Sequence, residues 1–223
     1  MAMNERSTRL LAEGLGSALL LAAVVGSGIM GDQLAGGNVA VALLANAIAT
    51  GAMLVVLITM LGPISGAHFN PAVSLVFALR GELPRSDLVP YVAVQIAGAA
   101  IGVWAAHLMF GEAVFQVSAK VRTGPAQWFS EFVAAFGLMA TILLTIKARA
   151  EAVATNVSLY IVSAYWFTAS TSFANPAVTA ARSLSDTFAG IRPEDVAAFT
   201  AAQFAGALVA HLVVRKLAMP TTR

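Results

Sequence analysis

Residues 68–73 read His-Phe-Asn-Pro-Ala-Val, and the last four of these letters recur as Asn-Pro-Ala-Val at residues 175–178. Each copy of this box follows a long apolar stretch. Asparagine is a strong helix N-cap, and proline is favoured in the first turn of a helix, where its missing N–H costs nothing. Each box therefore predicts the start of a helix. Because the surroundings are apolar enough to span a bilayer, we expect two half-helices that end inside a membrane.

The composition is that of an integral membrane protein. Of the 223 residues, 59% are hydrophobic and 11% are charged, against roughly 25% charged in soluble domains, and the mean hydropathy is +0.81. A membrane-spanning helix needs about 20 mainly apolar residues. Six stretches qualify, at about residues 10–30, 39–61, 88–110, 128–146, 152–170 and 196–217.

The basic residues predict the orientation. Six is an even number of spans, so both termini lie on one side, and that side carries nine of the 13 Lys and Arg residues. The other side carries four, Lys120, Arg122, Arg182 and Arg192. This bias predicts a multi-pass protein of the cell (inner) membrane with cytoplasmic termini. The basic residues lie at the ends of spans and form no single patch, which argues against nucleic-acid binding. Cysteine is absent, which excludes disulfides and thiolate metal sites.

Three landmarks occur twice in the same order. Glu13 in the first span corresponds to Glu131 in the fourth, the two boxes correspond, and Gln-x-x-Gly-Ala occurs at residues 95–99 and 203–207. Each half holds three spans, an odd number, so the second half must be inverted in the membrane. We therefore predict an all-α membrane protein with six transmembrane helices plus two half-helices in an inverted repeat. One domain would cover residues 1–223, with repeats at about 1–112 and 122–223.

Inversion brings the N-termini of the two half-helices together near the membrane midplane. Each N-terminus is the positive end of a helix dipole, and each asparagine amide can donate hydrogen bonds to a passing molecule. Irregular backbone is tolerated at this depth only where protein buries it or where it lines a wet cavity. The repeat therefore predicts a pore.

These features resemble the aquaporin and glycerol facilitator family, also called major intrinsic proteins. The stretch around the second box is similar to bacterial aquaglyceroporins linked to arsenic detoxification. The resemblance implies a homotetramer in membrane lipid with one pore per subunit, passive conduction of water and small neutral solutes, and no cofactor, metal or catalytic residue. It implies pore motifs at Asn70, Pro71, Ala72, Asn175, Pro176 and Ala177, and loop support by Glu13 and Glu131.

The chain departs from the family pattern at the constriction. Most members carry an arginine directly after the second Asn-Pro-Ala, but here that residue is Val178. The family's spacing places the other constriction residues at Thr50, Ser163 and Ser172. These side chains are small or medium in size and three of them carry hydroxyls. They imply a wide pore for glycerol-like polyols, for uncharged trivalent arsenic hydroxides such as arsenite, and for water.

Several residues have two interpretations. Arg182 lies four residues after Val178 and would place a charge in the outer vestibule, or it would pair with Asp186 at i,i+4, which we favour. The two glutamates could relay protons, but acceptance of loop N–H groups is the favoured role. Gln95 and Gln203 would line the pore or lock helices together.

Three rival functions remain open at this stage. A secondary transporter also uses inverted repeats and broken helices. A mainly water-selective aquaporin and a junction protein with a closed pore would share the fold. The sequence shows no nucleophile–base pair and no metal cluster, so an enzyme is not expected.

Overall fold

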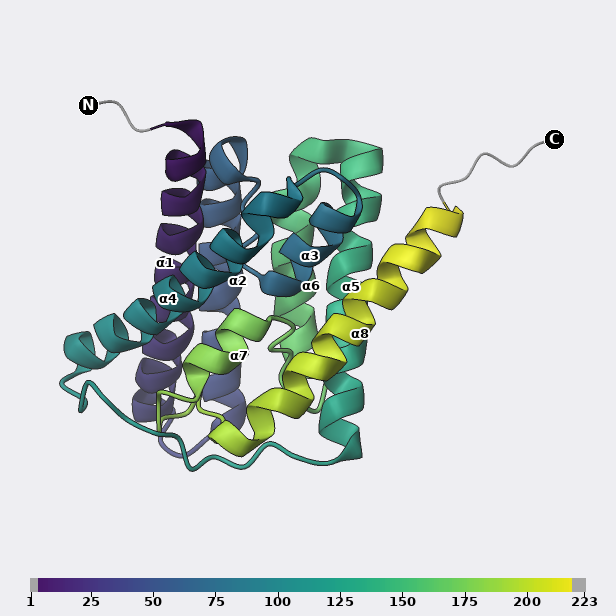
Figure 1. The fold of residues 1–223 in the computed structure, drawn as a ribbon. Helices are drawn as coiled ribbons and strands as arrows, with labels where there is room; N and C mark the ends of the chain where they lie inside the picture. The colour runs from purple at the N-terminus through teal and green to yellow at the C-terminus, as the bar shows by residue number, and fades with distance from the viewer. Residues whose placement is uncertain (1–3, 218–223) are drawn as a thin grey trace.

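The computed structural model describes residues 4–217 of the chain, so the predicted domain of residues 1–223 extends beyond the described part at both ends. Within that part the chain is helical and contains no strand. Six long helices are α1 (Glu5–Leu34), α2 (Val39–Ser65), α4 (Arg85–Phe110), α5 (Pro125–Arg149), α6 (Val153–Phe167) and α8 (Pro193–Leu217). Two short helices, α3 (Pro71–Leu79) and α7 (Pro176–Arg182), lie in the middle of the bundle (Figure 1).

The six long helices confirm the six predicted spans. Five helical stretches are long and apolar enough to cross a membrane, and one of them, Pro125–Phe167, is made of two helices. Its chain reverses at the short 3-10 helix η1 (Ala150–Ala152), so α5 and α6 run side by side (Figure 1). The fifth span ends at Phe167, earlier than expected, because Thr168 is extended and starts the loop to α7.

The two halves of the chain pack alike. Helix α1 packs on α4, and the corresponding helix α5 packs on α8. At both contacts the glycine of the Gln-x-x-Gly-Ala motif lets the backbones approach closely. A Cβ atom at Gly98 would lie 2.1 Å from the carbonyl oxygen of Gly14, and one at Gly206 would lie 2.2 Å from that of Phe132. Small residues allow such contacts between membrane helices.

Apolar side chains cover the outside of the bundle and charged side chains lie inside it, as in a membrane protein. Large apolar side chains such as Ile48, Val89 and Leu159 face outward and are exposed, whereas Glu13 and Glu131 are completely buried in the interior. The start of α1 and the end of α8 lie at the same end of the bundle (Figure 1). The polar interior is the place where a pathway through the bundle has to run.

Candidate functional site

Each half-helix begins at the asparagine of its box. Oδ1 of Asn70 accepts a hydrogen bond from the N–H of Ala72, and Oδ1 of Asn175 accepts one from the N–H of Ala177, both at 2.9 Å. The proline after each asparagine occupies the first turn, as its missing N–H favours. Each box is therefore an N-cap built from its own residues.

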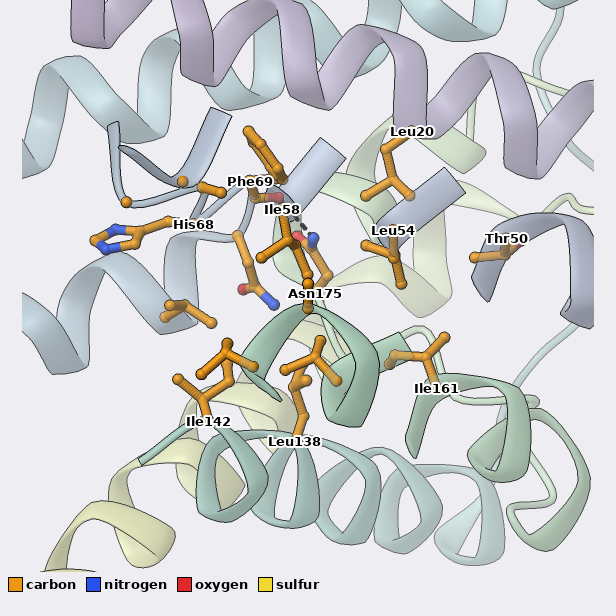
Figure 2. Close-up of a pocket in the computed structure, with 18 of the residues that line it drawn as sticks. Leu20, Thr50, Leu54, Ile58, His68, Phe69, Leu138, Ile142, Ile161 and Asn175 are labelled. Carbon is orange, nitrogen blue, oxygen red and sulfur yellow. Dashed lines mark hydrogen bonds between the residues drawn. The ribbon is translucent and has the colours of Figure 1, made fainter. Parts of the chain in front are cut away.

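The asparagine amides tie the two boxes to each other. Nδ2 of Asn70 donates to the carbonyl oxygen of Ala174 at 2.9 Å. Nδ2 of Asn175 donates to the carbonyl oxygen of Phe69 at 2.7 Å, the bond drawn in Figure 2. An amide nitrogen carries two N–H groups. One from each asparagine therefore fixes the opposite loop, and the other has no protein acceptor within residues 4–217.

Two buried carboxylates hold the loops that lead into the boxes. Glu13 on α1 accepts hydrogen bonds from both N–H groups before Asn70, and Glu131 on α5 does the same before Asn175, at 2.7–3.0 Å. The four donors are His68, Phe69, Phe173 and Ala174. A carboxylate that accepts several N–H groups is a structural anchor, because each unpaired N–H buried here would cost about 1–3 kcal/mol.

These loops need an anchor because their backbone is strained. Ala67 and Phe69 before the first box, and Ser172 and Ala174 before the second, all have φ between 47° and 50°. Residues other than glycine rarely adopt this left-handed conformation, which costs on the order of 1–2 kcal/mol each. The strain recurs at matching positions of the two halves.

Gln95 and Gln203 lock the carboxylates to the half-helices. Nε2 of Gln95 donates to Glu13 at 2.8 Å and to the hydroxyl of Ser74 on α3 at 2.9 Å. Nε2 of Gln203 donates to Glu131 at 2.6 Å and to the hydroxyl of Thr179 on α7 at 2.8 Å. Neither glutamine lines the cavity. Of the two interpretations left open by the sequence, the structure shows the helix-locking one.

A cavity of about 590 Å³ runs past both boxes. In Figure 2 His68 lies toward one end and Thr50 toward the other, with Asn175 between them. Apolar side chains from α1, α2, α5 and α6 form most of the wall, among them Leu20, Leu54, Ile58, Leu138, Ile142 and Ile161. Both asparagines and the loop residues before the boxes also line the cavity. The wall is therefore mainly apolar, with polar groups gathered along the two loops.

Three of the four expected constriction residues line this cavity. Thr50, Ser172 and Val178 are all buried and all face it. Ser163 differs from the expectation, because it lies on an exposed face of α6 and does not line the cavity. An α-helix has 3.6 residues per turn, so Ser163 lies about 200° around the helix from Ile161, which does line it.

Sequence reasoning missed Tyr165. This residue lines the cavity from α6, is buried, and places its hydroxyl 3.3 Å from the hydroxyl of Thr50 on α2. In the sequence, four residues recur at a spacing of four, which places them on one face of a helix, and all of them line the cavity: Val153, Val157, Ile161 and Tyr165. The Thr50 end of the cavity thus has an aromatic side chain that counting residues back from the second box does not identify.

Arg182 also lines the cavity, and the favoured pair with Asp186 is wrong. Helix α7 ends at Arg182, so Asp186 does not follow it by one helical turn. Nε of Arg182 donates to the carbonyl oxygen of Ala189, and Asp186 accepts a hydrogen bond from the N–H of Ala119. The guanidinium carbon of Arg182 lies 3.4 Å from the ring centroid of Phe173. The charge missing at Val178 is therefore present four residues further along the chain.

His68 lies toward the other end of the cavity. Its Nδ1 is 3.1 Å from the hydroxyl of Ser74, and its ring packs against those of Phe77 and Tyr91. Within residues 4–217, no group of three or more His, Asp and Glu side chains is placed to hold a metal ion. The arrangement provides a lined passage between His68 and Thr50.

Comparison with known proteins agrees with this geometry. The sequence model of the major intrinsic protein family matches residues 2–168. The chain is 61% identical to Aquaglyceroporin AqpS of Rhizobium meliloti (strain 1021) over 212 residues, which cover 95% of this chain and 91% of the relative. It is 37% identical to Probable aquaporin NIP7-1 of Arabidopsis thaliana over 117 residues, 52% of this chain and 40% of the relative.

The fold has a close structural counterpart. The crystal structure of the aquaglyceroporin from Plasmodium falciparum matches with a TM-score of 0.78 and covers 95% of this chain and 96% of its own, at 16% identity. That likeness concerns the fold alone, whereas the sequence matches show descent. The chain belongs to the major intrinsic protein family and is a passive membrane channel for small solutes.

Proposed function

We propose that the chain forms a wide pore for neutral solutes larger than water, namely glycerol-like polyols and uncharged trivalent arsenic hydroxides, together with water. The observation that carries this proposal is Val178 in the wall of a 590 Å³ cavity, where most relatives place an arginine. The name of the relative at 61% identity, an aquaglyceroporin, supports the same substrate class.

The cavity wall suits a molecule with hydroxyls on one side and carbon on the other. Thr50, Ser172 and the free N–H of each box asparagine offer hydrogen bonds along one part of the wall. Leu54, Ile161 and other apolar residues cover the rest. A polyol exchanges its water for these groups, whereas an ion loses a hydration shell that scattered hydroxyls cannot replace.

The remaining parts of the proposal concern the setting. We infer that Asn70, Asn175 and their boxes form the central barrier, with Thr50, Tyr165, Ser172 and Val178 around the outer selective region and Arg182 in the outer vestibule. The distribution of basic residues supports an inner-membrane location with cytoplasmic termini. The family supports a homotetramer, with the repeats of about residues 1–112 and 122–223 forming one pore in each subunit.

A solute series tests the substrate class. In proteoliposomes, permeability to glycerol and to arsenite at neutral pH should exceed that of protein-free liposomes by on the order of tenfold or more, and it should fall from glycerol to larger polyols as the pore diameter limits passage. Stopped-flow light scattering measures the polyols, and arsenic content of the washed vesicles measures arsenite. High water permeability with glycerol permeability equal to that of protein-free liposomes would instead establish the water-selective alternative.

A further inference from the structure

Three cations converge on one short stretch of backbone between α7 and α8. The carbonyl oxygens of residues 188–190 each accept a hydrogen bond from a different side chain, in the order Lys120, Arg182, Arg122. The Nζ of Lys120 lies 2.6 Å from its carbonyl oxygen and the Nε of Arg122 lies 2.8 Å from its own. We call Lys120, Arg122 and Arg182 the outer collar.

Within the described part of the chain the outer collar forms no ion pair, although the carboxylate of Glu131 is close enough to act on Arg122 and Arg182. Asp195 is close, but its side chain accepts from the backbone N–H of Arg122 and pairs with Arg192. Buried charges are costly unless they are paired. The outer collar is therefore a positive cluster whose compensation is incomplete.

Burial affects both loop cations, Lys120 and Arg122, and neighbouring positive charges also act on Lys120. Burial, followed by the charges of Arg122 and Arg182, lowers the pKa of Lys120 to about 8, and Asp32 at the end of α1 opposes this shift. Burial also lowers the pKa of Arg122 to about 10, and the charge of Glu131 opposes this shift. Both side chains are charged at neutral pH, and both would gain from a nearby negative charge.

The outer collar also has hydrogen-bond donors to spare. A guanidinium has five N–H groups, and of those on Arg182 only the Nε–H has a protein acceptor among the described residues. Arg182 lines the cavity, as does Ser172, whose Oγ is buried and has no hydrogen-bond partner in the same part of the chain. Unused donors therefore face the outer end of the cavity, where acceptors are lacking.

We propose that this outer end binds a small monovalent oxyanion, held by the guanidinium of Arg182 and the hydroxyl of Ser172, with the charges of Lys120 and Arg122 beside them. An oxyanion supplies several acceptor oxygens and the missing negative charge, and charge-assisted hydrogen bonds are the strong ones. Passage further in would strip its hydration against an apolar wall, so the anion stops at the outer collar. Because Arg182 and Ser172 line the same cavity that solutes use, a bound anion obstructs neutral solutes.

Methanesulfonate and dimethyl sulfone are the probes, because they have similar size and shape and differ in charge. We expect titration calorimetry on the purified full chain to detect binding of methanesulfonate and none of dimethyl sulfone. In proteoliposomes, methanesulfonate should reduce glycerol flux, and half-maximal inhibition should occur at the concentration that gives half-maximal binding in calorimetry. Dimethyl sulfone should not reduce the flux. The flux measurement rests on the proposed function, whereas the calorimetric measurement does not. A parent protein that does not conduct glycerol would contradict the proposed wide pore. If methanesulfonate does not bind, or if both probes bind equally well, the anion site is overturned.

Matched variants locate the site. Arg122→Gln should weaken methanesulfonate binding severalfold, because it removes a positive charge beside Arg182 without changing the residues that line the cavity. Arg192→Gln removes the same charge from the same side of the protein outside the outer collar, and should leave binding unchanged. Lys120→Gln, a more accessible change, provides the second test if Arg122→Gln does not assemble. Equal affinity in the parent and in an assembled collar variant, or an equal loss in Arg192→Gln, would contradict the assignment.

The pH dependence gives an independent readout. Lys120 is charged below its pKa of about 8 and loses its charge above it. Methanesulfonate stays ionised throughout, so its binding should weaken severalfold between pH 7 and pH 9, and in Lys120→Gln this part of the pH dependence should disappear. Arg122, Arg182 and Asp32 are the other charged groups that act on Lys120. Identical pH profiles for parent and variant would exclude Lys120 from the site.

Discussion

Val178→Arg is expected to reduce glycerol and arsenite flux on the order of tenfold or more, with a smaller loss of water flux. The new guanidinium would enter a cavity in which Thr50 and Ser172 are small, so it would fill space and add a charge where polyols now pass. Stopped-flow measurement of both solutes and of water in the same proteoliposomes gives the ratio directly.

Two features of this variant need control. Arg182 follows at i,i+4, and like charges at that spacing are mildly destabilising, so the amount of assembled protein has to be measured with the flux. Val178→Met adds length without charge and should reduce glycerol flux less than arginine does. If assembled Val178→Arg passes glycerol as fast as the parent, residue 178 does not line the selective region and the wide-pore proposal has to be abandoned.

Glu131→Gln is expected to lose both stability and flux. Glu131 accepts the N–H groups of Phe173 and Ala174, and an amide in its place presents its own N–H groups to one of these donors. Leaving one or both buried N–H groups unpaired costs about 1–6 kcal/mol at 1–3 kcal/mol each. The strained loop before Asn175 would then relax and displace the second box.

Thermal unfolding in detergent and glycerol flux in proteoliposomes measure this effect. Glu194→Gln is the control, because Glu194 is exposed at the start of α8 and its change removes the same charge. Glu13→Gln should behave like Glu131→Gln, since Glu13 holds the corresponding loop. A Glu131→Gln protein with the parent's unfolding temperature and flux would show that the carboxylate does not support the loop.

The fold was predictable because its signals are local. Apolar length predicted the spans, and the Asn-Pro pairs predicted the starts of α3 and α7 through capping and the missing proline N–H. The odd number of spans in each half required inversion. None of these steps depends on a contact between distant residues.

The lining of the cavity was less predictable because it depends on helix rotation and on where helices end. Counting residues from the second box placed Ser163 at the constriction, but α6 turns Ile161 and Tyr165 toward the cavity. The expected Arg182–Asp186 pair assumed a helix that continues, whereas α7 ends at Arg182. The sequence left the role of Gln95 and Gln203 open, because an amide can line a pore or join two helices equally well. Their hydrogen bonds to the buried Glu13 and Glu131, which only the structure reveals, show that they join helices.

The central claim is passive conduction of neutral solutes, and concentration dependence under imposed gradients tests it most directly. Initial rates of glycerol entry into proteoliposomes should rise linearly with glycerol concentration across the measurable range. They should be the same with and without a proton or Na⁺ gradient, and unaffected by ionophores that abolish those gradients. Saturation of the rate together with an absolute requirement for a cation gradient would contradict the channel and establish the transporter alternative.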